Sequence, residues 1–264
     1  MSLQVLVCVK QTPSSTSVAV DPATGAPKAD AACAMNPLDE YAVEEALRLK
    51  ERVPGTKALA LSLGTPACEE TLRAALALGI DEAALLTDPA FAGSDPLASA
   101  YLLSLAVRKA GTGPQLVLAG RQSSDGESGA VPPALAAWLG WPCASSVRKV
   151  LEVSETSVTV ERAMEDGAET LRLPLPAVLS VTKEINEPRL PSLKGKMAAR
   201  KAALPRWGAA ELGAEPSKFG AASAAVPAGT VPVPQRPPGA VVPGATAEEK
   251  AAALVARLKE MKLL

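Results

Sequence analysis

Short apolar runs alternate with amphipathic stretches along the first two thirds of this 264-residue chain. The apolar runs have the length of buried strands, and they predict strands at residues 3–9, 57–63, 83–87, 115–119 and 176–181. Between the runs, apolar residues recur at helical spacing behind start signals at Asn36-Pro37, Thr65-Pro66, Asp95-Pro96 and Pro132. Because strand and helix alternate, the pattern predicts a doubly wound, mostly parallel sheet with helices on both faces.

The rhythm changes after Cys143, where three stretches predict antiparallel strands that join the sheet as a small extension. They lie at residues 147–153, 157–162 and 170–173, with Asp166-Gly167 as a turn. Near the start of the chain, residues 11–30 are rich in Ser, Thr, Pro and Gly and predict a loop.

The last sixty residues have a different composition. From about residue 206 the chain becomes rich in Pro, Ala and Gly, and residues 225–244 predict an extended arm without a core of its own. Residues 247–263 predict a final amphipathic helix, whose apolar stripe consists of Ala251, Leu254, Val255, Leu258 and Met261. This stripe needs a surface to cover it, either on the chain's own domain or on a partner.

Composition excludes several functional classes. The 27 basic and 28 acidic residues nearly balance, which gives no electrostatic reason to expect nucleic acid or an anionic membrane as a partner. The chain has no histidine, the commonest general base and metal ligand, so we expect neither catalytic residues nor a metal site. No stretch is long enough for a membrane span, and the first apolar run lacks the basic start of a signal peptide.

The four cysteines, Cys8, Cys33, Cys68 and Cys143, lie far apart and form no CxxC pair. They are typical of reduced thiols, so the expected location is cytoplasmic.

A glycine-rich loop, residues 120–133, follows the fourth predicted strand. Its glycines allow a ligand close to the backbone, Ser128 offers a hydroxyl, Arg121 offers a charge, and the next helix offers its N-terminus to a phosphate. Open α/β sheets bind ligands at the carboxyl ends of their strands, where this loop lies. The loop contains neither GxxxxGK[ST] nor GxGxxG, and a loop that only reverses the chain is an equal alternative.

A second segment, residues 186–201, follows the last core strand and carries Leu190 and Leu193 among prolines, lysines and glycine. No helical or strand period hides both leucines, so the pattern predicts an uncapped docking loop with Leu193 as its apolar tip. The alternative is that Leu193 folds back onto its own domain.

Four blocks of sequence together resemble the β subunit of electron transfer flavoprotein. They are residues 5–11 (VLVCVKQ), residues 35–46 (MNPLDEYAVEEA), the loop 120–133, and LPAV at 175–178 followed by NEPR at 186–189. They occur in the family's order and cover about residues 3–205.

The resemblance implies an adenine-nucleotide-hydrolase-like fold and a heterodimer in which an α subunit holds most of the redox-active FAD. The chain would bind a structural AMP, and the complex would shuttle electrons from flavin dehydrogenases, such as the acyl-CoA dehydrogenases of fatty acid β-oxidation, through a quinone oxidoreductase to the quinone pool. The resemblance also divides the chain into a nucleotide-binding domain (1–185), a partner-recognition loop (186–205), and an arm with a helix that contacts the α subunit (206–264).

The resemblance also implies site residues. Those that would line the cofactor are Cys8, Asn36, Pro37, Leu38, Asp39, Leu63, Gly120, Arg121, Gln122, Ser123, Asp125, Gly126, Glu127, Ser128, Gly129, Ala130 and Val131. Those that would bind partner dehydrogenases are Asn186, Glu187, Pro188, Arg189, Leu193 and Met197.

Three alternatives stay open. The first is an electron-bifurcating relative with a second FAD in place of AMP, although the turn at residues 36–39 favours the non-bifurcating branch. The second is a free-standing nucleotide-binding regulator of the universal-stress type. The third, a pyrophosphate-releasing synthetase, lacks the SGGxDS-type loop expected after the first strand. The sequence also departs from the family at Leu38, where many relatives carry an aromatic residue, and after Met197, where a lysine run is usual.

Overall fold

A nine-stranded sheet forms the centre of the first of two compact units in the computed structural model, which describes residues 3–14, 32–110, 115–226 and 238–264. The units are Met1–Ala228 and Gly229–Leu264. The strands of the sheet are β1 (Gln4–Cys8), β4 (Lys57–Leu63), β5 (Glu82–Leu86), β6 (Leu116–Gly120), β7 (Cys143–Val153), β8 (Ser157–Met164), β9 (Gly167–Pro174), β10 (Ala177–Val181) and β11 (Arg206–Trp207).

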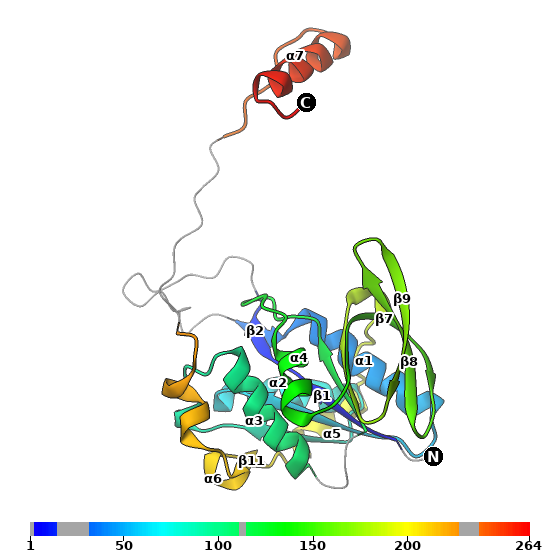
Figure 1. Cartoon of the computed structure of the whole chain (residues 1–264), viewed down its shortest axis with the longest axis vertical. Coiled ribbons are helices and arrows are strands. Elements are labelled where there is room, and N and C mark those ends of the chain that lie inside the picture. The colour runs from blue at the N-terminus through cyan, green and yellow to red at the C-terminus, as the bar shows by residue number, and fades with distance from the viewer. Residues whose placement is uncertain (1–2, 15–31, 111–114, 227–237) are drawn as a thin grey trace. The chain divides into compact units, whose positions relative to one another are not determined.

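The strand order is β11-β5-β4-β1-β6-β10-β7-β8-β9. Neighbours from β11 to β7 run parallel, and β7, β8 and β9 pair antiparallel. Figure 1 shows this antiparallel ribbon in green beside the central strands. The predicted fold class, a mostly parallel α/β sheet with an antiparallel extension, is confirmed.

Helices cover both faces of the sheet, and β1 shows why. Its alternate residues Val5 and Val7 pack in one core cluster with α1 (Pro37–Arg52) and α2 (Glu69–Leu78). Leu6 and Cys8 face the other way, toward α3 (Pro96–Lys109) and α4 (Val131–Leu139). Both sets are buried, as the two-residue period of a central strand requires.

Residues 11–13 do not form the predicted loop. They form β2 (Gln11–Pro13), which pairs antiparallel with β3 (Cys33–Met35). Each strand has three residues and β2 contains a proline, so neither carries a readable alternation. Residues 15–30 of the predicted loop lie outside the described residues.

The prediction that an arm begins at residue 206 is wrong at its start, because residues 206–222 pack against the sheet. β11 extends the sheet beside β5, and α6 (Ala209–Leu212) follows it. Leu212 and Phe219 are buried in the core cluster of α3, and the Phe219 ring meets Phe91 edge-on at 5.3 Å. Sequence composition missed this packing because only a few apolar residues supply it.

The second unit contains α7 (Ala247–Glu260), three residues shorter than the predicted helix. Thr246 accepts a hydrogen bond from the Glu249 N–H, and the Glu249 carboxylate accepts one from the Thr246 N–H, which forms a capping box. The apolar side chains Leu254 and Val255 of α7 and Met261 directly after it are exposed. Most of the predicted arm before it, residues 227–237, lies outside the described residues.

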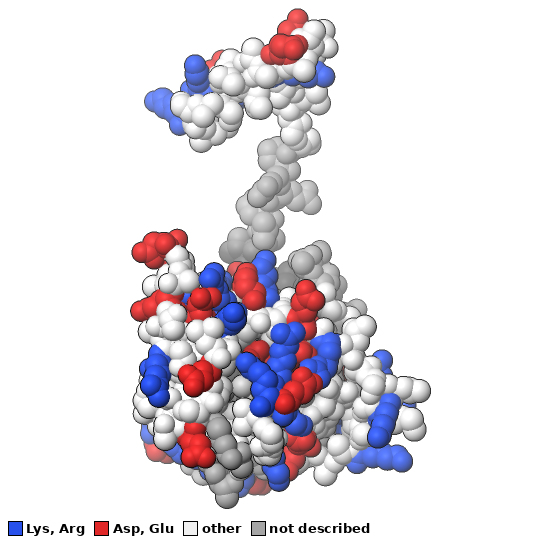
Figure 2. All heavy atoms as spheres, turned by 90° about the vertical axis from the view of Figure 1, so that its right-hand side faces the viewer, with Lys and Arg blue, Asp and Glu red and all other residues white. Residues whose placement is uncertain are grey.

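Charges of both signs intermingle on the surface. Figure 2 shows Lys and Arg side chains interspersed with Asp and Glu side chains on one face of the first unit. Neighbouring strands of the antiparallel ribbon contribute the pairs Arg148–Glu161 at 2.7 Å and Arg162–Glu169 at 2.6 Å. None of the helices in the described ranges has the length and apolar composition that a bilayer crossing needs.

Candidate functional site

A cavity of about 300 Å³ lies at the carboxyl ends of β1, β4 and β6. The chain winds from β1 to β4 and β5 on one side and returns to β6 on the other, so β1 and β6 flank the topological switch point. Ligands of open α/β sheets bind at this point, and the volume is at the lower end of the roughly 300–1,000 Å³ of small-molecule sites.

The structure brings eleven of the predicted cofactor residues together around this cavity: Cys8, Asn36, Asp39, Leu63, Gly120, Gln122, Ser123, Gly126, Ser128, Gly129 and Val131. The other six are sequence neighbours of lining residues but do not line the cavity themselves: Pro37, Leu38, Arg121, Asp125, Glu127 and Ala130. The sequence reasoning missed a further nine lining residues: Val9, Lys10, Leu61, Ser94, Pro96, Ser99, Leu103, Ala119 and Pro132.

Asn36 holds the glycine-rich loop in place. It occupies the cap position of α1, but its side chain makes no cap hydrogen bond there. Instead its amide donates to the carbonyl of Gln122 at 2.9 Å, and its Oδ1 accepts from the Ser124 N–H at 3.0 Å. Asn36 is 1% exposed, so its buried side chain links the start of α1 to the loop through hydrogen bonds.

Asp39 joins the ends of the two switch-point strands. Its carboxylate accepts the Lys10 N–H at 2.7 Å and the Gly120 N–H at 3.1 Å. Burial raises the pKa of Asp39 to about 7, against the opposing effect of hydrogen bonds from Asn36, Lys10 and Gly120. The same burial, with the charge of Asp39 as a smaller cause, raises the pKa of the Cys8 thiol to about 12. Cys8 therefore lines the cavity as a neutral thiol.

We expect Asp39→Asn to change how stability depends on pH. Because the folded-state pKa lies above the ordinary value of 3.8, the folded chain keeps a proton that the unfolded chain releases, so this group's stabilisation is lost as pH rises from about 4 to 7. In urea unfolding, the parent chain should lose at least about 2 kcal/mol relative to Asp39→Asn between pH 4.5 and 7.5. A difference between the two proteins that stays constant with pH would contradict this assignment.

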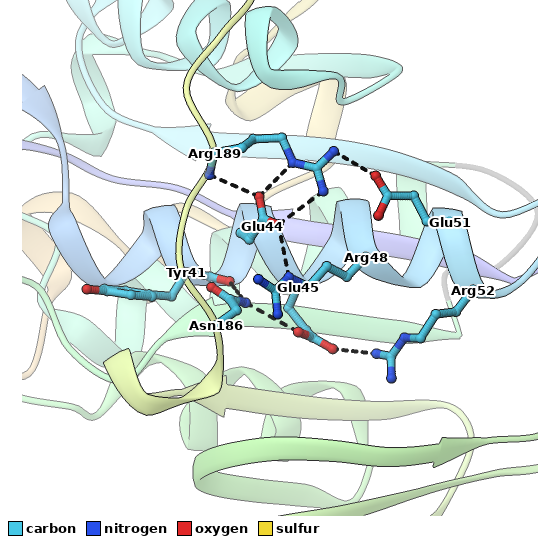
Figure 3. Close-up of polar contacts among 8 residues, drawn as sticks. All are labelled: Tyr41, Glu44, Glu45, Arg48, Glu51, Arg52, Asn186 and Arg189. Atoms are coloured by element: carbon cyan, nitrogen blue, oxygen red, sulfur yellow. Dashed lines mark hydrogen bonds and ion pairs between the residues drawn. The ribbon is translucent and has the colours of Figure 1, made fainter.

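The segment after β10 is anchored to α1 by two of its predicted partner-binding residues. The Asn186 amide donates to the Tyr41 carbonyl at 3.0 Å and to the Glu45 carboxylate at 3.3 Å (Figure 3). Arg189 donates from its backbone N–H and its guanidinium to Glu44, whose side chain is 5% exposed. Arg189 also donates to Glu51 at 2.7 Å.

These contacts decide the charge of Glu44. Burial would raise its pKa, but hydrogen bonds from Arg189 and Arg48 outweigh burial and hold the pKa below its ordinary value. Glu44 is therefore an ionised, buried anchor for the segment.

Residues 193–201 form the capped helix α5 (Leu193–Lys201), so the prediction of an uncapped loop is wrong there. The Ser192 hydroxyl accepts the Gly195 N–H at 3.0 Å. At the other end, the Arg73 guanidinium donates to the carbonyls of Ala199 and Ala202 at 2.5 and 3.5 Å. Gly195 lies against the Ala77 carbonyl of α2, where a Cβ would collide with it.

The apolar side chains on this segment point outward. Leu193 is 76% exposed, Leu190 is 92% exposed and Met197 is 58% exposed. Leu193 therefore does not fold back onto its own domain. Glu187 is also exposed, and Pro188 is half-buried beside a second cavity that Arg189 and Leu190 help to line.

The described residues contain no group of three or more Cys, Asp or Glu side chains arranged to hold a metal ion. The cavity has the composition of a binding site, because apolar side chains line it together with several serines and with glycines of the loop.

Together, the fold and the site define an open α/β domain with a ligand-sized cavity at its topological switch point. The segment after β10, which is anchored to α1, exposes apolar side chains on the surface. The family model described as "Electron transfer flavoprotein domain" matches residues 28–212. The chain belongs to the electron transfer flavoprotein family and is similar to the β subunits of that family. This confirms the resemblance read from its sequence. The β subunits of this family are electron-transfer proteins, and the family implies an α-subunit partner.

Three named relatives are consistent with this family membership. The caffeyl-CoA reductase-Etf complex subunit CarD of Acetobacterium woodii is 35% identical over 264 residues, which cover 99% of this chain and 100% of the relative. The electron transfer flavoprotein subunit beta of Thermoanaerobacterium thermosaccharolyticum is 43% identical over 199 residues, or 73% of each chain. The protein FixA of Azorhizobium caulinodans is 36% identical over 219 residues, or 81% of this chain and 78% of the relative.

Proposed function

We propose that this chain is the β subunit of a heterodimeric, cytoplasmic electron transfer flavoprotein. In this proposal it accepts electrons from flavin dehydrogenases, such as acyl-CoA dehydrogenases, and passes them through a quinone oxidoreductase toward the quinone pool. The redox-active FAD is held mainly by the α subunit, so the chain contributes no catalytic residue of its own. Family membership and the anchored segment with its exposed leucine support this proposal.

The cavity at the switch point would hold a structural AMP. Its volume suits a mononucleotide, and Leu61, Leu63 and Leu103 offer apolar walls to an adenine ring. Asn36 and Asp39 fix the loop and the strand ends around it. When bound, the nucleotide would add packing and charge matching rather than redox chemistry.

The recognition surface would consist of Leu193 and Met197 on α5, with Leu190 before it. Asn186 and Arg189 belong to it indirectly, because they fasten the segment to α1. The arm that precedes α7, and α7 itself, would contact the α subunit, which would cover the exposed stripe of Leu254, Val255 and Met261.

Leu193→Ala should weaken electron delivery from a partner dehydrogenase. Burial of one leucine at an interface is worth about 1.5–3 kcal/mol, so KM for the flavoprotein should rise about 10- to 100-fold while its flavin content stays unchanged. The matched control is Leu151→Ala, which removes an exposed leucine from β7. Equal KM values for Leu193→Ala and the parent would remove α5 from the recognition surface.

Co-expression with an α subunit tests the heterodimer. The proposal predicts a one-to-one complex that carries flavin and accepts electrons from a dehydrogenase, and a chain that is colourless when expressed alone. A stable solitary chain that turns over a substrate unaided would contradict it.

The second candidate is an electron-bifurcating relative with a further FAD in this cavity. The match to CarD over the whole chain favours a reductase complex as the setting, because that relative's name places it in a complex with caffeyl-CoA reductase. The number of AMP and FAD molecules per complex decides between the two.

A further inference from the structure

Lys10 reaches the loop end of the cavity from the carboxyl end of β1. Its ammonium lies 2.7 Å from both carboxylate oxygens of Asp125 and 3.4 Å from the Ser123 hydroxyl. Its backbone N–H is held by Asp39, so the start of the side chain is fixed, while the side chain as a whole is 48% exposed. Lys10 is the only cationic side chain among the described residues that line the cavity.

The helix that follows the loop offers a phosphate fewer donors than usual. Pro132 and Pro133 occupy the first turn of α4 and have no N–H. The Ala130 N–H is already directed to the Ser128 hydroxyl at 3.4 Å. Val131 is therefore left as the N–H donor of that turn, and a phosphate dianion at this end of the cavity needs a further positive group.

Arg121 does not supply that group. It does not line the cavity, and its guanidinium donates to its neighbour Gln122 at 3.1 Å.

We propose that Lys10 is the phosphate-binding cation of the nucleotide site and that Asp125 is its built-in competitor. The inference rests on the proposed function, in which the cavity takes an adenine mononucleotide. In the structure Lys10 is paired with Asp125; on nucleotide binding the ammonium exchanges the carboxylate for the phosphate. The exchange costs little, because an ion pair with side chains 48% and 33% exposed contributes little to stability, and the flexible lysine stem allows it.

The charge of Lys10 gives the site its selectivity, and competition from Asp125 sets how strongly an anion must bind. A ligand must offer a charge stronger than one carboxylate to capture Lys10, so a phosphomonoester dianion is favoured over the uncharged nucleoside. Asp125 thereby lowers the affinity for the nucleotide without contacting the adenine end of the cavity.

Calorimetric titration of the full-length chain, stripped of nucleotide, tests this with AMP and adenosine as probes. Lys10→Met should weaken AMP binding about 10- to 100-fold, as loss of a charge-assisted contact predicts, and leave adenosine binding unchanged. Asp125→Asn should tighten AMP binding several-fold, and this gain should disappear in the double variant. Arg121→Met is the matched control and should leave AMP affinity unchanged.

The outcomes distinguish the role of Lys10 from the proposed function. If the parent chain binds AMP and Lys10→Met binds it equally tightly, the role of Lys10 is overturned while the proposed function stands. If Asp125→Asn weakens AMP binding, the competitor role is overturned. A parent chain that binds neither probe overturns both the inference and the nucleotide site on which it rests. Urea unfolding of each variant confirms that the comparison is between folded proteins.

Discussion

Gly120→Ala is expected to lower the free energy of unfolding by about 3 kcal/mol or more and to abolish nucleotide binding. Gly120 ends β6 directly against the first turn of α1. A Cβ there would lie 2.7 Å from the Leu38 carbonyl carbon and 2.9 Å from the Asp39 nitrogen, and it would collide with the Asp39 carboxylate. These neighbours are mostly backbone, so β6 and α1 must separate. That separation breaks the hydrogen bond between Gly120 and Asp39 at the floor of the cavity.

Gly126→Ala is the matched control for this experiment. Gly126 lies in the same loop, but a Cβ there meets only the Ser123 hydroxyl at 3.6 Å, an ordinary contact distance. Urea unfolding followed by circular dichroism should therefore show a large loss for the first variant and a small change for the second. Equal stability of the two variants would contradict the close packing between β6 and α1.

Arg189→Ala is expected to lower the free energy of unfolding at neutral pH by about 2 kcal/mol. The substitution leaves the Glu44 carboxylate, 5% exposed, with Arg48 as its remaining cation at 3.0 Å. The value is below the roughly 3–5 kcal/mol of fully buried pairs, because Arg189 itself is 37% exposed. The segment before α5 should also lose its attachment to α1, so that hydrogen exchange at residues 187–191 speeds up.

Two further variants define what Arg189 contributes. Arg189→Lys should recover part of the stability, since lysine keeps the charge but cannot reproduce the forked contact with Glu44. Arg148→Ala removes a more exposed partner, which pairs with Glu161 across two strands, and should cost less than about 1 kcal/mol. The anchoring role of Arg189 would be contradicted if its alanine variant were as stable as Arg148→Ala.

Local patterns in the sequence were sufficient for most of the sheet and its covering helices. The apolar run at residues 57–63 coincides with β4, and the Asn36-Pro37 signal marks the start of α1 correctly. Asp95-Pro96 marks the start of α3, where the Asp95 side chain accepts the Ala98 N–H at 2.8 Å. These features depend on side chains only a few positions apart, which is the range that a sequence pattern describes.

Features that depend on distant residues could not be predicted in this way. Helix α5 has a glycine and several lysines, and it gains its stability from Arg73, 126 positions earlier, which donates to its last carbonyls. The short strand β11 likewise exists because β5 offers it an edge. Both lie in stretches whose composition alone indicates a loop.

The candidate site likewise contains features that depend on neighbouring residues and features that depend on distant ones. The glycine-rich loop and the turn at residues 36–39 could be identified from residue types, because glycines and a helix start have local meaning. Lys10 was missed because its partner Asp125 is 115 positions away. Its place immediately after the first strand was the available signal, since carboxyl ends of parallel strands meet at the ligand edge of the sheet.

The most direct test of this account is a count of the nucleotides that co-purify with the chain and its α subunit. The complex is denatured, the released nucleotides are separated by chromatography, and AMP and FAD are quantified against protein. The account predicts one AMP and one FAD per heterodimer, with the AMP lost from a complex that carries Gly120→Ala. Two FAD and no AMP per heterodimer would contradict it.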